Sequence, residues 1–110
     1  MDRLPPDVAE VVAELRNGLV ELYGPRFRDL LLYGSYARGD QREGSDVDLL
    51  VLLNGPVDTG REILRLEAIT WPLSLDRGIV LSVMPVSYEA YQKGETSFLR
   101  IARKDAMHAA

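Results

Sequence analysis

Cysteine is absent from the sequence, and histidine occurs once, as His108. The lack of cysteine excludes disulfides, thiol catalysis and thiolate metal sites. A single histidine excludes multi-histidine metal sites and argues against a histidine-based catalytic triad. Because His108 lies close to the end of the sequence, we expect it to be disordered rather than functional. Any catalysis therefore has to use other groups.

A long apolar run and a surplus of positive charge are also missing. The longest apolar stretch, Val47 to Leu53, is interrupted by Asp48, so we expect no signal peptide and no membrane span. Thirteen basic residues face 17 acidic ones, which gives a formal net charge of −4. An acidic surface disfavours direct binding to nucleic-acid phosphates. We therefore expect a soluble cytoplasmic protein that binds neither membrane nor nucleic acid.

The composition is that of an ordinary globular protein. Hydrophobic residues make up 46% and charged residues 27% of 110 residues. This length suits one small domain, which we place at residues 1–110. No room remains for a separate domain that binds a second substrate, so such a site would have to come from a partner or a second copy of the chain.

Apolar residues at three- and four-residue spacing predict the helices. The first runs from Pro5–Pro6 to Gly24-Pro25, and the second from Thr59 to Leu75. Pro72 falls inside the second pattern, which predicts a kink or an end near Trp71. We also predict a short helix that begins after Ser87, with Ser87 as its N-cap, and a last helix over 98–107.

Three apolar segments predict strands: Leu30–Tyr33, Asp46–Leu53 and Ile79–Val86. The connection between the first two is short, so they could be antiparallel, whereas a long helix between the second and third permits parallel pairing. The order of elements predicts an α+β fold, or two-layer α/β. It has a small mixed sheet of three to four strands, with helices packed mainly on one face.

Two carboxylates stand at the start of the second strand, at Asp46 and Asp48. Side chains two apart on a strand point to the same face, with Cα atoms roughly 6.5–7 Å apart. Two such carboxylates repel each other, and a divalent cation relieves the repulsion. Mg²⁺ suits a site with one or two protein carboxylates, waters and substrate phosphates. The alternative is that Asp46 serves the turn and Asp48 faces solvent.

A Gly-Ser pair, Gly34-Ser35, follows the first predicted strand. Glycine lets backbone N–H groups approach a phosphate closely, and the serine hydroxyl adds a donor where a short helix could start. The alternative is a simple turn. Loop and carboxylates together predict a phosphate site beside a metal site.

The stretch Gly34-Ser35-Tyr36-Ala37-Arg38-Gly39, followed by Ser45-Asp46-Val47-Asp48-Leu49, resembles the signature of the DNA polymerase β-like nucleotidyltransferases. More narrowly, it resembles the minimal nucleotidyltransferases, which often act as antitoxins beside HEPN-domain toxins. The resemblance implies the nucleotidyltransferase fold, Mg²⁺, and ATP as the donor of an AMP group to a partner protein.

The same resemblance implies roles for single residues. Asp46 and Asp48 would be the catalytic metal ligands, and Gly34 and Ser35 would bind phosphates. Arg38 could neutralise phosphate charge, although an exposed surface arginine is the alternative. Ser45 could donate to a phosphate, although capping the turn before the strand explains it equally well.

One feature of the family pattern is missing. Active members usually carry a third carboxylate on a neighbouring strand, and by register it would fall near Val80, where the sequence has no acid. Asp76, expected in the turn before that strand, is a candidate substitute. Two functions stay open: a transferase that modifies a partner, and a catalytically weakened module that neutralises a partner by contact alone. The aromatic residues Trp71, Tyr88, Tyr91 and Phe98 could form the interface or pack in the core.

Overall fold

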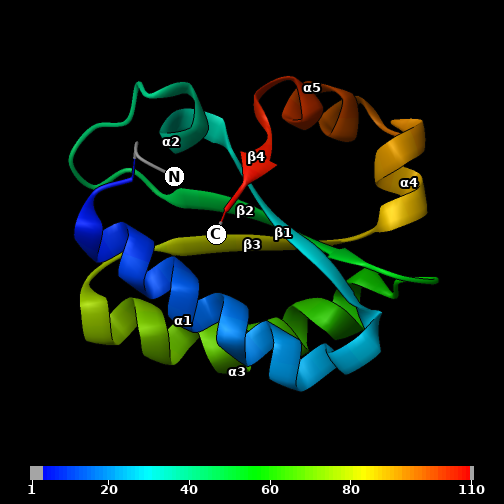
Figure 1. Ribbon diagram of the computed structural model, residues 1–110, viewed down its shortest axis with the longest axis horizontal. Helices are drawn as coiled ribbons and strands as arrows, with labels where there is room; N and C mark the ends of the chain where they lie inside the picture. Colours follow the sequence, from blue (N-terminus) through cyan, green and yellow to red (C-terminus); the bar gives the residue numbers. More distant parts are fainter. Residues whose placement is uncertain (1–3, 110) are drawn as a thin grey trace.

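Two long helices, α1 (Pro6–Tyr23) and α3 (Thr59–Arg77), lie side by side on one face of a sheet (Figure 1). The computed structural model describes residues 4–109. Pro5 and Pro6 begin α1, where a missing N–H costs little, and Gly24, with φ of 53°, ends it. The first predicted helix is therefore confirmed.

The sheet has four strands within residues 4–109: β1 (Phe27–Tyr33), β2 (Val47–Leu53), β3 (Leu81–Ser87) and β4 (Met107–His108). Their order is β3-β2-β1-β4. β1 is antiparallel to β2 and to β4, whereas β2 and β3 are parallel. The predicted mixed sheet is confirmed, with the expected direction for each of the three long strands.

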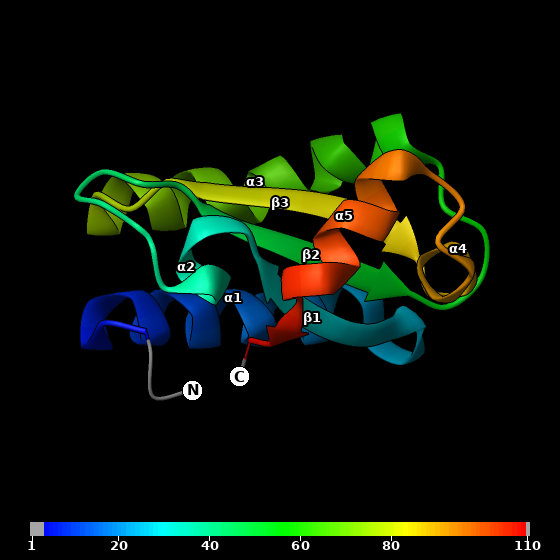
Figure 2. The ribbon, with the colours of Figure 1, turned by 90° about the horizontal axis from the view of Figure 1, so that it is seen from above.

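Two short helices, α4 (Tyr88–Lys93) and α5 (Ser97–Asp105), lie on the other side of the sheet (Figures 1 and 2). A third, α2 (Gly34–Arg38), follows the end of β1, and its buried residues Tyr36 and Ala37 belong to the same hydrophobic cluster as α1 and α3. A 3₁₀ turn, η1 (Gly24–Arg26), joins α1 to β1. Ser87 caps α4 as predicted, because its Oγ accepts a hydrogen bond from the Ala90 N–H at 3.0 Å. None of the helices within residues 4–109 combines the length and apolarity that crossing a bilayer requires.

The strand β2 separates two hydrophobic clusters. Leu49 and Val51 pack into the cluster that includes α1 and α3, whereas Leu50 and Leu52 belong to the cluster on the opposite face. Because side chains alternate along a strand, Asp48 lies on the same face as Leu50. This alternation directs Asp48 toward α5, away from the two long helices.

The structure corrects two expectations about α3. Of the two outcomes predicted at Pro72, a kink or an end near Trp71, the end is wrong, because the helix continues through Pro72 to Arg77. Pro72 deprives the Ala68 carbonyl of its usual donor, but Ala68 is exposed and its carbonyl can bond to water. The packing of Leu66 and Leu73 against the core holds the helix together on both sides of the proline. Asp76 consequently lies in the last turn of α3 and not in the turn before β3.

The expectation of a disordered His108 is also wrong. His108 pairs with Leu31 in the short strand β4, and its Nδ1 lies 2.7 Å from Oδ2 of Asp29. The predicted last helix ends at Asp105 instead of Met107, because the chain turns back to add β4 beside β1. Two residues carry too little periodicity to predict such a strand.

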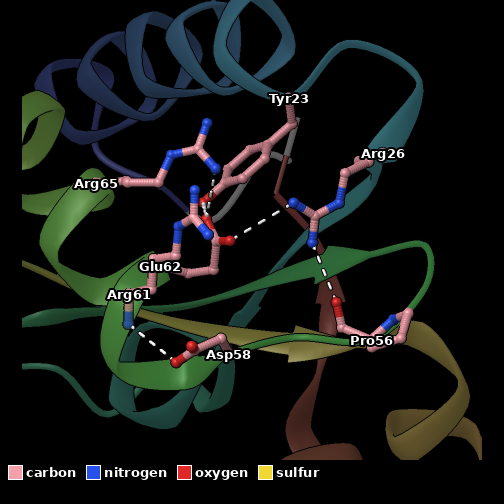
Figure 3. A network of polar contacts seen from close by, with 7 residues as sticks. All are labelled: Tyr23, Arg26, Pro56, Asp58, Arg61, Glu62 and Arg65. Atoms are coloured by element: carbon pink, nitrogen blue, oxygen red, sulfur yellow. Dashed lines mark hydrogen bonds and ion pairs between the residues drawn. The ribbon is translucent and has the colours of Figure 1, made fainter.

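A buried polar network joins the C-terminal end of α1 to the start of α3 (Figure 3). Glu62 has only 3% of its surface exposed. It accepts a hydrogen bond from the Tyr23 hydroxyl at 2.8 Å and ion pairs with Arg65 at 3.3 Å and Arg26 at 3.5 Å. The network lies near the end of β2 that pairs with the start of β1, whereas Asp48 lies at the opposite end.

Candidate functional site

The antiparallel pairing of β1 and β2 brings the Gly-Ser pair to the carboxylates. Tyr33, the last residue of β1, is opposite Asp48, and α2 begins at the next residue, Gly34. Gly34 has φ of 74°, and a Cβ atom at this position would collide with the Asp48 carboxylate. Only glycine adopts this positive φ readily and also leaves room for the Asp48 carboxylate. The loop and Asp48 are therefore in contact, as the sequence predicted.

The surroundings of Asp48 disfavour its charged form. Burial raises the pKa of the Asp48 carboxyl, the nearby Asp46 charge raises it further, and Arg38 acts in the opposite direction. Burial and the Asp48 charge also raise the pKa of the Tyr33 hydroxyl. A cation bound between these groups would relieve the repulsion.

A cavity of about 330 Å³ opens beside this loop. Its polar wall consists of Gly34, Ser35, Arg38 and Asp48, and its other wall comes from α5. Asp46 is exposed and lies outside this lining, although its charge acts on Asp48. The volume falls within the range of about 300–1,000 Å³ that small-molecule sites occupy.

The comparison with protein families decides what this arrangement is. The family model described as nucleotidyltransferase domain matches residues 12–105, which include β1, α2, β2 and β3. The chain belongs to the nucleotidyltransferase domain family. The match includes every residue of the cavity and of the carboxylate pair.

Curated relatives and solved structures agree with this assignment. Two proteins of Methanocaldococcus jannaschii, each named a putative protein adenylyltransferase, are similar to this chain. One is 34% identical over 84 residues, covering 76% of this chain and 78% of the relative. The other is 32% identical over 93 residues, covering 84% and 89%.

Two crystal structures share the fold. A structure described as a putative nucleotidyltransferase from Sulfolobus solfataricus has a TM-score of 0.65 at 17% identity and covers 92% of this chain and 78% of its own. A structure described as a toxin-antitoxin with AMP-PNP has a TM-score of 0.62 at 19% identity, with coverage of 93% and 72%. At these identities the likeness supports the nucleotidyltransferase fold alone.

Arg38 of this nucleotidyltransferase lines the cavity and is already ion paired. Its Nε lies 3.1 Å from Asp40, and one terminal nitrogen lies 3.1 Å from Asp105 of α5. These two hydrogen bonds raise the pKa of the guanidinium. A phosphate bound by Arg38 would have to share it with these carboxylates. The sequence analysis missed Asp105, because 67 residues separate it from Arg38 and no motif connects them.

Ser45 already has a local partner in the turn before β2. Its Oγ accepts a hydrogen bond from the Arg42 N–H at 2.9 Å, and its own N–H donates to the Arg42 carbonyl at 2.9 Å. Ser45 does not line the cavity. The arrangement favours the alternative given above, in which Ser45 stabilises the turn.

The strand next to the carboxylates carries no acid. Ser82 of β3 pairs with Asp48, and the Val47 N–H donates to the Val80 carbonyl at 2.9 Å, so these two positions flank the carboxylate pair. Asp76 cannot take the missing role, because α3 packs on the opposite face of the sheet and Asp76 lies 3.5 Å from Arg77. Within residues 4–109, no three acidic or histidine side chains gather closely enough to hold a metal ion.

The residues present nevertheless fit a Mg²⁺ ion brought with phosphates. Mg²⁺ keeps several waters and needs only one or two protein carboxylates when substrate phosphates complete its shell. Asp46 and Asp48 supply such a donor set. The glycine at position 34 leaves free the space beside Asp48 that any other side chain would fill. We therefore treat these two aspartates as the candidate metal ligands.

The aromatic residues considered for an interface divide into two groups. Tyr88 and Tyr91 pack against the hydrophobic cluster on the α4–α5 face. For these two residues the structure therefore favours packing in the core over an interface. Trp71 is exposed beside a larger, mainly apolar cavity of about 530 Å³ between α3 and β3. No basic residue lines that cavity, and neither Asp46 nor Asp48 does, so it does not suit a nucleotide. Phe98 is exposed and lines the smaller cavity beside Asp48.

Proposed function

We propose that this chain is a Mg²⁺-dependent nucleotidyltransferase that transfers AMP from ATP to a partner protein. The observation that carries the proposal is the contact between Gly34 and the Asp48 carboxylate, inside a chain of this family. The names of the two archaeal relatives, protein adenylyltransferases, support a protein acceptor. A shared fold with a toxin-antitoxin structure that contains AMP-PNP supports a toxin as partner, and we suggest one of the HEPN type.

The reaction assigns a task to each candidate residue. A hydroxyl oxygen of the acceptor attacks the α-phosphorus of ATP, the bond to the bridging oxygen of pyrophosphate breaks, and the acceptor hydroxyl loses its proton. Mg²⁺, when bound, would neutralise charge that develops on the phosphates. Asp46 and Asp48 would hold the ion, while Gly34 and Ser35 would bind the phosphates from the adjoining loop. Arg38 would neutralise further phosphate charge in the cavity.

A contact-only antitoxin is the second candidate function. The absence of an acid at Ser82 and Val80 favours it, because the neighbouring strand then offers no carboxylate as a base for the acceptor proton. General-base assistance is typically worth 10²–10⁴-fold, so transfer without it would be slow. A residue of the partner could supply the missing base. In that case the partner would supply both the acceptor hydroxyl and the base. We also propose that the reaction takes place in the cytoplasm.

Transfer of label from ATP tests the proposal directly. The purified protein is incubated with α-labelled ATP, Mg²⁺ and a lysate of its source organism, and labelled protein bands are recorded. We expect one band that disappears with Asp48→Asn. Asp76→Asn is the matched control, since it removes a carboxylate of the same kind from the far face of the sheet and should leave the band unchanged.

The contact-only function gives a different result in the same samples. It predicts no label, together with a stable complex that survives both Asp46→Asn and Asp48→Asn in a pull-down. A band that persists in Asp48→Asn would contradict the proposed mechanism, because the candidate metal ligand would then be dispensable.

A further inference from the structure

The helix α5 has a second apolar face that the hydrophobic core does not use. Leu99 and Ala102 are buried, at 4% and 3% exposure, and they hold the helix on the sheet. Phe98 and Ile101 are 41% and 63% exposed. They are three residues apart and therefore lie on one side of the helix. Both line the cavity beside Asp48.

This apolar wall is fixed in position relative to the phosphate loop. Asp105, four residues after Ile101, pairs with Arg38 of α2 at 3.1 Å. The ring of Phe98 packs edge to face on Tyr33, with centroids 5.6 Å apart and an interplanar angle of 84°. Tyr33 is the residue before Gly34, so both contacts join α5 to the loop. The wall is thus held in place before any ligand binds.

The cavity therefore has two chemically different walls. One presents Gly34, Ser35, Arg38 and the candidate metal ligand Asp48. The other, from α5, presents the exposed apolar side chains of Phe98 and Ile101, followed by Asp105, which is ion paired with Arg38. A ligand that suits both walls has a polyanionic end and a flat, weakly polar end. A nucleoside triphosphate has this composition. We infer that Phe98 and Ile101 bind the base of the nucleotide. This inference rests on the proposed function and names the residues that recognise the nucleoside.

Inorganic triphosphate separates recognition of the base from recognition of the phosphates, because it lacks the nucleoside. Binding of Mg²⁺·ATP and of Mg²⁺·triphosphate is measured by isothermal titration calorimetry for the wild type and for Phe98→Ala. Contacts between a base and an aromatic side chain are worth about 5- to 100-fold in affinity. We expect Phe98→Ala to weaken ATP binding by this factor and to change triphosphate binding by less than about twofold.

Two further variants keep the result interpretable. Ile101→Ser changes a residue that contributes little to the core, so it should fold normally and should weaken ATP binding selectively. Leu64→Ala removes a side chain of similar size and 70% exposure from α3, and should change neither ligand.

Each remaining outcome overturns the inference. If the ratio of the two affinities is the same in the wild type, Phe98→Ala and Ile101→Ser, the base binds elsewhere. If the wild type binds ATP no more tightly than triphosphate, the nucleotide function stands and the base site does not. If the wild type binds neither ligand, the proposed function fails as well.

Discussion

Gly34 is the residue on which the candidate site depends most directly. Its positive φ and its contact with Asp48 mean that any Cβ atom strains the backbone and displaces the carboxylate. We expect Gly34→Ala to weaken Mg²⁺·ATP binding by about 10- to 100-fold, the loss typical of a disturbed metal ligand. Calorimetric titration of the folded variant with Mg²⁺·ATP measures this loss.

Gly39 provides a matched control for that prediction. It has φ of 80°, and a Cβ atom there would contact nothing within 4 Å. Gly39→Ala therefore imposes a comparable backbone cost, about 1–2 kcal/mol of stability, without touching Asp48. Equal affinity of Gly34→Ala and Gly39→Ala for Mg²⁺·ATP would mean that the position of the Asp48 carboxylate does not affect nucleotide binding.

Ser82 is the position at which the missing acid can be restored. It pairs with Asp48 on the parallel strand β3, and directly paired residues project to the same face of a sheet. We expect Ser82→Asp to raise the rate of AMP transfer by about tenfold or more, toward the 10²–10⁴-fold typical of a general base. The rate of label transfer from ATP, with the acceptor fixed, measures this gain.

Ser82→Asn is the control, because asparagine is nearly isosteric with aspartate but carries no charge and accepts no proton. A rate that rises equally in both variants would point to a change in packing and not to a base. Without Mg²⁺, Ser82→Asp should also lower the thermal midpoint, since it places a third negative charge beside Asp46 and Asp48.

At the level of elements, the junction of α1 and α3 depends on the buried hydrogen bond between Tyr23 and Glu62 (Figure 3). Tyr23→Phe leaves one oxygen of a buried carboxylate without this donor, so we expect a loss of about 1–2 kcal/mol in the free energy of unfolding. Denaturation by urea measures it. Nucleotide binding should not change, because the junction lies at the far end of β2 from Asp48.

The pH dependence of that loss checks its cause. Burial, followed by the hydrogen bond and charge of Glu62, raises the pKa of Tyr23. In the unfolded chain a tyrosine ionises near pH 10, whereas folded Tyr23 keeps its proton. The contribution of Tyr23 to stability is therefore complete below pH 10 and decreases above it. The difference in the free energy of unfolding between the wild type and Tyr23→Phe should accordingly shrink as the pH rises above 10. Tyr88→Phe, which removes the acceptor of an exposed hydrogen bond from Gln92, should leave the free energy of unfolding nearly unchanged.

The elements also show where sequence patterns suffice. The three- and four-residue spacing of the apolar residues predicted α1, and the apolar runs predicted the three long strands. The lengths of the connections allowed the directions that the strands have, antiparallel for β1 and β2 and parallel for β2 and β3. Local patterns failed where tertiary packing decides: α3 continues through Pro72, and two residues at 107–108 become a strand because β1 offers them a free edge. In the site, the motif predicted the approach of Gly34 to Asp48. Asp105 and the apolar wall of α5 were missed, since only the folded chain brings α5 to the loop.

The whole molecule separates stability from the candidate chemistry. The larger hydrophobic cluster lies on the face covered by α1 and α3, and the carboxylates and the cavity lie on the face of α5. Substitutions on one face can therefore be used as controls for the other. A ligand that binds only the folded chain, however, stabilises both faces together, because one sheet is shared by the two clusters.

Thermal unfolding with and without nucleotide uses this coupling. At a free Mg²⁺·ATP concentration of about ten times Kd, binding adds about 1.4 kcal/mol. For a domain of this size, that free energy corresponds to a rise of roughly 6–11 °C in Tm. Excess EDTA or Asp48→Asn should remove the rise, whereas Asp76→Asn should keep it, since that carboxylate lies on the far face. An equal rise in Asp48→Asn would mean that the nucleotide binds away from the carboxylates, and the family motif would then not mark the site of this chain.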